Sequence, residues 1–188
     1  MKEPFDRTFY ERDPREVAPA LLGAVLVHGP TSGMIVETEA YLAERDPAAH
    51  AFRGKTPRTA VLFGPPGHAY VYRTRAHHCL NVAVQEEGVP GCVLIRAVAP
   101  VTGIATMRRR RGDVPERRLT DGPAKLCQAF AIDIRHYGVD LTTRDGLAIL
   151  DDGARHATVQ TGPRVGISVA TTWPLRYWLP AERHVAHL

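Results

Sequence analysis

The chain has 188 residues, of which 44% are hydrophobic and 23% charged, so it fits one domain that can bury most of its apolar surface. Its three cysteines are far apart and form no Cys-x-x-Cys pair, which argues against a disulfide framework and a structural zinc site. We expect no signal peptide, no membrane span and a reducing cytoplasm as the compartment.

The formal net charge of +4 is concentrated in one short segment. Residues 101–118 contain six arginines and two acidic residues, so the rest of the chain is neutral overall. A basic cluster on a neutral body suits a polyanion such as nucleic acid, and it makes Arg109 and Arg110 candidate DNA contacts. The same cluster is equally consistent with a solvated helix end that has no partner.

Capping residues and the residue pattern predict three helices. Asp13 caps an expected helix that begins at Pro14 and runs to about Leu22, with Pro19 producing a kink or a late start. Two later segments also predict helices: 102–110 and 123–131.

Alternating apolar residues between turn signals predict several strands. The expected strands are 24–28, 33–41, 69–73, 77–85, 91–99, 147–150 and 164–170. A turn at residues 29–32 would join the first two of them. Because most strands come before the helices, without regular alternation, the order predicts an α+β fold with a mainly antiparallel sheet.

One predicted strand carries an unusual pair of carboxylates. Strict alternation would place four of its residues on one face: Ile35, Glu37, Glu39 and Tyr41. Glutamate is depleted in strands, and a buried carboxylate is costly unless it is paired. An arginine salt bridge would explain one glutamate. Two glutamates beside a tyrosine, followed by a long loop with His50, make a functional site a competitive interpretation.

Two further strands carry polar or aromatic side chains that need an explanation. Tyr70 and Tyr72 share one face and Val71 the other, a pattern that alone predicts core aromatics. Asn81 interrupts an apolar run, and a buried asparagine needs hydrogen-bond partners or a function. A backbone hydrogen bond at a strand edge would satisfy it.

The order of these segments resembles the alkyladenine (3-methyladenine) DNA glycosylase family. The matching segments fall within about residues 35–168 and read IVETEAY, AYVY, HCLN, CVLIRA, GPAKLCQA and RVGIS, with His50 nine residues beyond Tyr41. The combination of IVETEAY and GPAKLCQA is specific, whereas any one segment would be weak. The resemblance implies a single glycosylase domain over residues 1–188, with a curved, mainly antiparallel sheet and flanking helices like the C-terminal domain of formyltransferases.

The resemblance also implies roles for individual residues. Glu39 matches the general base that activates a water for attack on the sugar C1′. The aromatic pocket that holds the flipped base matches three residues: Tyr41, His50 and Tyr72. Asn81 matches the residue that crowds the 2-amino group of guanine, and Arg96 matches a residue at the rim of the active site beside the lesion's backbone.

The chemistry of these residues agrees with that assignment. A base inside a duplex cannot be reached, so the nucleotide must be extruded into a pocket, where tyrosines favour cationic alkylated purines. No lysine matches an active-site position, so we expect hydrolysis without a lyase step. The expected partner is double-stranded DNA containing damaged purines, and the expected protein is a monomer that needs no cofactor and no metal.

One turn departs from the family pattern. Between Tyr72 and His78 the family has a longer turn with a tyrosine that enters the duplex, whereas the turn here is shorter and lacks a tyrosine. Arg73, Arg75 and His77 are the residues of this turn that we expect to contact DNA, because arginine stacks on bases and binds phosphate.

Two other functions remain open from the sequence. A metal-dependent nuclease could use Glu37 and Glu39 together with nearby Glu44, Asp46 and His50, and it would lose activity on chelation. A non-catalytic nucleic-acid-binding module is the second alternative, although a binder has little use for a carboxylate beside an aromatic pocket.

Overall fold

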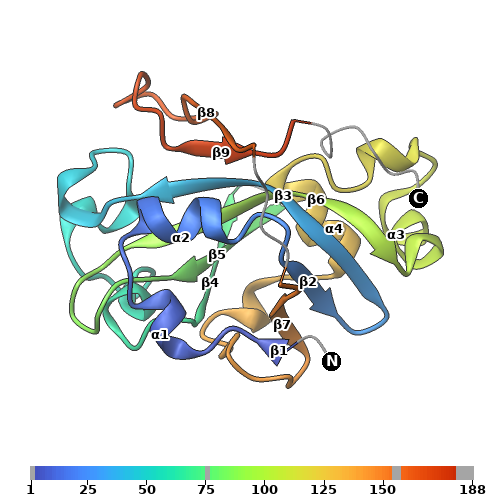
Figure 1. Cartoon of the computed structure of the whole chain (residues 1–188), viewed down its shortest axis with the longest axis horizontal. Helices are drawn as coiled ribbons and strands as arrows, with labels where there is room; N and C mark the ends of the chain where they lie inside the picture. The colour runs from blue at the N-terminus through green and yellow to red at the C-terminus, as the bar shows by residue number, and fades with distance from the viewer. Residues whose placement is uncertain (1–2, 75–76, 154–157, 181–188) are drawn as a thin grey trace.

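The computed structural model describes residues 3–74, 77–153 and 158–180, and these residues form one curled sheet with short helices packed around it (Figure 1). Nine strands take part: β1 Glu3–Pro4, β2 Val25–His28, β3 Thr31–Tyr41, β4 Ala69–Thr74, β5 His77–Ala83, β6 Cys92–Thr102, β7 Leu147–Asp151, β8 Gln160–Gly162 and β9 Arg176–Trp178. Every strand pairing is antiparallel, which confirms the predicted α+β fold.

The helices are short. The α-helices are α1 Arg7–Tyr10, α2 Pro14–Ala20, α3 Ile104–Arg111 and α4 Pro123–Phe130. The 3-10 helices are η1 Ala43–Arg45, η2 His50–Arg53, η3 Ala60–Phe63, η4 Glu116–Arg118 and η5 Ile134–His136. No helix in the three described ranges is long and apolar enough to cross a membrane.

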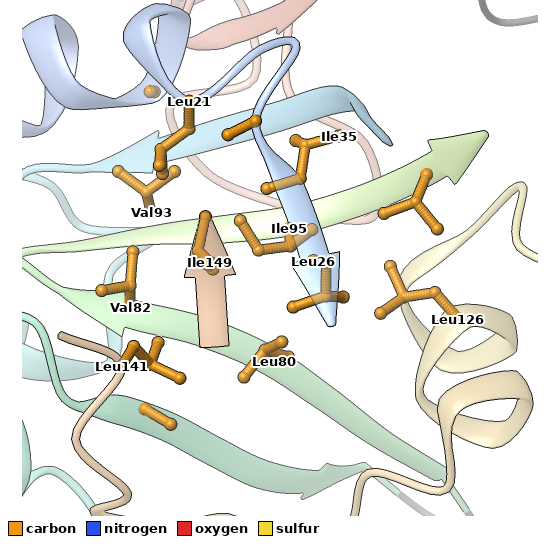
Figure 2. Close-up of a cluster of buried hydrophobic side chains, with 14 of the residues drawn as sticks. Leu21, Leu26, Ile35, Leu80, Val82, Val93, Ile95, Leu126, Leu141 and Ile149 are labelled. Carbon is orange, nitrogen blue, oxygen red and sulfur yellow. The ribbon is translucent and has the colours of Figure 1, made fainter. Parts of the chain in front are cut away.

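The sheet follows the order β1-β7-β2-β3-β6-β5-β4, and β9 adds to β3 beyond the end of β2. The sheet is curled, so that side chains on its apolar face meet in one core even when they come from strands far apart in the sheet. Ile149 on β7 and Leu80 on β5 share that core although three strands lie between them in the sheet (Figure 2). Leu21, just after α2, and Leu126 on α4 complete it. The long central strands β3 and β6 thus pack one face against this core.

Most predicted elements form, with shifted ends. Asp13 caps α2 by accepting a hydrogen bond from the Arg15 N–H, but the helix ends at Ala20, one residue after Pro19, and does not start late. The hairpin turn is shorter than predicted, because His28 pairs with Thr31 across only two intervening residues. A tight two-residue turn extends β3 by two residues at its start.

The strand predicted over residues 164–170 was wrong. That segment is irregular, and β8 ends before it at Gly162. Arg164 is drawn into the interior by a buried carboxylate, and Gly166 has a φ of +79°, a conformation that strands do not use. Its apolar residues instead run along the surface, where Val165 and Val169 are exposed.

A β-bulge changes the face that the carboxylates of β3 occupy. The register between β3 and β6 shifts on both sides of Glu37, and Arg96 is skipped in the pairing. Ile35 therefore packs into the main core, whereas Glu37 and Glu39 face the other side. The prediction that Ile35 shares their face was wrong, because strict alternation ignores the extra residue of a bulge.

Candidate active site

A cavity of about 400 Å³ opens on the face of the sheet opposite the main core. Its walls come from β3, β4, β5 and β6, from the loop after β3, and from the irregular segment 165–169. All five residues expected to bind substrate line it: Tyr41, His50, Tyr72, Asn81 and Arg96. Segments far apart in sequence thus converge on one pocket of the size that small-molecule sites have.

Glu39 lies directly behind the pocket wall. Its side chain is 0% exposed, and it does not itself line the cavity. Oε2 accepts a hydrogen bond from the Tyr41 hydroxyl at 2.9 Å, and Oε1 accepts one from the Val165 N–H at 2.8 Å. Nη1 of Arg96 lies 3.2 Å from Oε1. Three donors that belong to the pocket wall therefore hold the carboxylate.

Burial raises the pKa of Glu39 above that of an ordinary glutamate. Arg96, the Val165 N–H and the Tyr41 hydroxyl act in the opposite direction, because each stabilises the ionised form. Burial also raises the pKa of Tyr41, and the adjacent Glu39 charge adds to that rise, so the hydroxyl stays protonated and donates. The result is a desolvated carboxylate with strong, fixed hydrogen bonds.

Arg96 connects the two carboxylates of β3. Its Nε donates to Oε1 of Glu37 at 3.2 Å while its Nη1 contacts Glu39. Arg176 on β9 also donates to Glu37, at 3.1 Å. Arg96 is only 14% exposed, so it lies inside the pocket and not at the rim where we expected it. Glu37 is thus paired with two arginines, one of which also contacts Glu39.

The aromatic wall is built on β4 and η2. His50 packs edge-on against the ring of Tyr72, with the two ring centroids 4.5 Å apart. Its Nδ1 lies 2.8 Å from the hydroxyl of Tyr70, which is buried behind Tyr72. Burial, reinforced by the nearby Arg58 charge, lowers the pKa of His50 to about 4. His50 is therefore a neutral wall residue at pH 7.

Asn81 has its amide group fixed by two neighbours. Its Nδ2 donates to the backbone oxygen of Tyr70 at 3.0 Å, and the Sγ of Cys92 lies 3.9 Å from its Oδ1. The backbone hydrogen bond that the simplest interpretation expected is therefore present, although β5, the strand that carries Asn81, has β4 and β6 on its two sides. An amide held in this way is a rigid part of the pocket wall.

A buried ion pair supports the pocket, and sequence reasoning missed it. Arg164 donates to both oxygens of Asp46, with the Nη2–Oδ1 distance at 2.8 Å, and both side chains are 0% exposed. Arg164 also donates to the backbone oxygen of Ala40 and lies 4.5 Å from the Tyr41 ring. The RVGIS segment pointed to this region, but nothing local to it identifies Asp46 as the partner.

The metal-ligand role considered for Asp46 does not fit this geometry. Its two oxygens are occupied by Arg164 and by the backbone N–H groups of Leu42 and Ala48. Within the part of the chain that the structure describes, no group of three or more histidine, cysteine or acidic side chains is placed to hold a metal ion. The site is built for hydrogen bonding to a carboxylate, with no cation-binding cluster among the described residues.

The residues expected to contact DNA fall in two places. Arg73, near the end of β4, and His77, at the start of β5, are both exposed, and Arg75 lies outside the described residues. Arg109 is exposed on α3, whereas Arg110 donates to the backbone oxygen of Ala129 and is partly buried. Arg110 thus caps the end of α4.

The two places lie at different distances from the pocket. The helix α3 follows the end of β6 that pairs with Ser32, whereas Glu39 lies seven residues further along β3. At about 3.3 Å per residue, the positions of Ser32 and Glu39 lie roughly 23 Å apart along β3, so α3 begins far from Glu39. The hairpin, by contrast, is continuous with the strands that carry Tyr72 and Asn81.

Comparisons with known proteins identify the family of the chain. The family model described as methylpurine-DNA glycosylase (MPG) matches residues 8–183. A protein of Rhodopseudomonas palustris (strain BisB18) named "Putative 3-methyladenine DNA glycosylase" is 49% identical over 182 residues, which cover 96% of this chain and 89% of the relative. One of Burkholderia cenocepacia (strain HI2424) with the same name is 47% identical over 185 residues, covering 96% and 89%. The chain belongs to the methylpurine-DNA glycosylase family.

Proposed function

We propose that this DNA repair glycosylase accepts a damaged purine, flipped out of duplex DNA, in the 400 Å³ pocket and hydrolyses its N-glycosidic bond with a water activated by Glu39. The observation that carries the proposal is a desolvated carboxylate behind an aromatic-walled pocket, held by donors from three of the wall residues. A general base works best when its pKa lies near the working pH, and burial moves Glu39 in that direction.

The proposed reaction breaks the bond between C1′ of the sugar and the base nitrogen. The bonding electron pair leaves with the base, the water oxygen bonds to C1′, and one water proton passes to Glu39. Positive charge develops on the sugar as the base leaves, and the Glu39 carboxylate stabilises it. Without an active-site lysine, the product is an abasic site and no strand is cut.

Glu39 needs contact with water that the closed wall does not provide. Its oxygens are occupied by Tyr41, Arg96 and Val165, so a water must displace one donor. Val165 is the donor we expect to yield, because its segment has no regular structure and its side chain is 49% exposed. Substrate binding would then move the 165–169 segment and leave Arg96, Tyr41 and the buried Arg164 in place.

The duplex would lie across the region where β4 ends and β5 begins. Arg73 and His77, with Arg75, are the residues we propose for gripping it there. Because arginine is a poor apolar plug for the gap left by a flipped base, we expect faster excision where the lesion is mismatched than where it is well paired.

We further propose a monomer in the reducing cytoplasm. The three cysteines, which are buried and form no disulfide, support the reducing compartment.

The two alternative functions receive less support. A nuclease would need a cation held by acidic residues, yet the carboxylates of this site are bonded to arginines. A pure binding module would retain, at a desolvation cost, a buried glutamate that contacts no ligand. The hydrolytic function gives the buried Glu39 a role and requires no cation.

The experiment is a panel of duplexes that each carry one lesion: 3-methyladenine, 7-methylguanine, hypoxanthine or ethenoadenine. Abasic sites are scored by alkaline cleavage under single turnover, with and without excess EDTA. We expect abasic sites from at least one lesion, equally in both conditions. Activity that is lost on chelation and restored by Mg²⁺ would support the nuclease, and binding without abasic sites would support the binding module.

A further inference from the structure

A guanidinium group lies behind the aromatic wall. Cζ of Arg58 is 4.9 Å from the ring centroid of Tyr72, and its Nη2 is 3.3 Å from Nε2 of His50. Tyr72 lines both the pocket and a second surface groove of about 530 Å³, whereas Arg58 lines the groove and is absent from the described lining of the pocket. Arg58 therefore contacts the wall from the side away from a bound base.

This contact fixes the protonation of His50. Arginine can only donate, so Nε2 of His50 must accept from Arg58, and the ring proton must lie on Nδ1. Nδ1 then donates to the Tyr70 hydroxyl 2.8 Å away. The nearby Arg58 charge contributes to the low pKa of His50, and it also acts on the pKa of Tyr70 and of Cys79 in the pocket. The field of Arg58 thus reaches across the wall.

The other charged groups around the pocket balance one another. Three carboxylates and three guanidinium groups form the buried network: Glu37, Glu39, Asp46, Arg96, Arg164 and Arg176. Arg58 adds one positive charge to this neutral set. It also occupies one face of the Tyr72 ring, and a base stacked on the opposite face would share the same π electrons with it.

A positive charge at this position treats two kinds of lesion differently. A base alkylated at a ring nitrogen is a cation, and the Arg58 charge opposes its binding. A neutral damaged base, such as a deaminated purine, is not repelled. When its bond to C1′ breaks, the electron pair makes it an anion until it takes a proton from water, and the Arg58 charge stabilises that anion.

Resting on the proposed function, we propose that Arg58 is a specificity-determining residue, which biases the pocket toward neutral damaged purines and against cationic ones. A base stacked on the inner face of Tyr72 would lie about 8 Å from the guanidinium group. At the intermediate to high dielectric of a partly exposed charge, this distance corresponds to a change in selectivity of about two- to tenfold.

The test compares excision of hypoxanthine, which is neutral, with that of 7-methylguanine, which is cationic, in the same duplex sequence under single turnover. Arg58→Gln removes the charge, and Arg58→Lys retains it without the planar group. Lys55→Gln is the matched control, because Lys55 lies 5.9 Å from the Phe63 ring in the same loop, and that ring is outside the described pocket lining. The pKa of His50 is followed by NMR in each variant.

We expect the ratio of hypoxanthine to 7-methylguanine excision to fall about two- to tenfold in Arg58→Gln. It should stay near the wild-type ratio in Arg58→Lys and Lys55→Gln. The His50 pKa should rise toward its ordinary value in Arg58→Gln alone. An unchanged ratio in a folded Arg58→Gln variant overturns the inference and leaves the glycosylase intact, whereas a wild-type protein that excises no lesion overturns the proposed function itself.

Discussion

The protein uses arginine in two contrasting regions. At the pocket, Arg96 is largely buried and Arg164 is fully buried, and both are bonded to carboxylates. On α3, Arg108 pairs with Glu116 in solvent, and Arg110 caps a neighbouring helix. The run of four arginines on α3 dominates the charge pattern of the sequence, yet the isolated arginines are the ones placed at the candidate active site. The run of arginines therefore marks a solvent-exposed surface, whereas the arginines at the candidate active site are single residues scattered along the sequence.

The largest expected effect concerns the carboxylate that the buried region surrounds. Glu39→Gln should lower single-turnover excision by about 10²–10⁴-fold and leave lesion binding intact, because positioned base catalysis contributes that much. Glu37→Gln, which alters a residue bonded to Arg96 and Arg176, should cost less. If Glu39→Gln cuts within about threefold of the wild type, Glu39 is not the base.

The same residue predicts a pH dependence. Glu39 must be ionised to accept a proton, and its pKa lies above the ordinary value of 4.5. Wild-type excision should therefore decline as the pH falls through that raised pKa, at a higher pH than an exposed glutamate would give. A rate that is flat down to pH 4.5 contradicts the assignment.

The next effect concerns stability and compares the two regions directly. Asp46→Asn leaves Arg164 buried without its counter-charge, which should lower the free energy of unfolding by about 3–5 kcal/mol. Glu116→Gln breaks the exposed pair on α3 and should cost about 0–1 kcal/mol. Urea denaturation of both variants measures the difference, and equal losses would remove the distinction between the regions.

A smaller effect concerns discrimination at the wall. Asn81→Ala should admit the 2-amino group of guanine and raise release of undamaged guanine about tenfold or more, since exclusion needs a defined polar or steric element. Excision of a 2-amino-free lesion such as hypoxanthine is the reference. Guanine release that stays at background while hypoxanthine is still excised would show that another group excludes it.

The smallest effect concerns α3. Arg109→Gln should reduce the slope of log affinity against log salt by about 0.9 if Arg109 contacts one phosphate. Arg110→Gln should instead destabilise the fold, because it removes the donor to the end of α4. An unchanged salt slope in Arg109→Gln would leave α3 as a solvated helix end, which lies roughly 23 Å along β3 from Glu39.

The sequence predicted the parts of the molecule whose causes are local. The cap at Asp13 and the alternation of Tyr70 and Tyr72 follow from neighbouring residues, and the antiparallel sheet follows from the order of the elements along the chain. The bulge at Glu37 did not follow, because a single extra residue in the pairing leaves no mark on the periodicity. Its consequence is large, since it moves Ile35 to the core face.

The sequence predicted which residues line the pocket better than it predicted how they are arranged. The five pocket residues came from a family resemblance, which carries positions without geometry. The place of Arg96 between two carboxylates, and the irregular course of residues 164–170, depend on contacts between segments that only the folded chain brings together. Residue patterns within one segment contain no information on such contacts.

The pairing of Asp46 with Arg164 spans 118 positions of the chain. Contacts between residues so far apart in sequence form slowly, because closing a long loop costs entropy before the contact can stabilise the chain. During synthesis, Glu39 and Tyr41 leave the ribosome long before the residue that supplies the Val165 N–H. A nascent chain that stops before residue 165 would thus contain Glu39 without one of the three donors that hold its carboxylate in the folded protein.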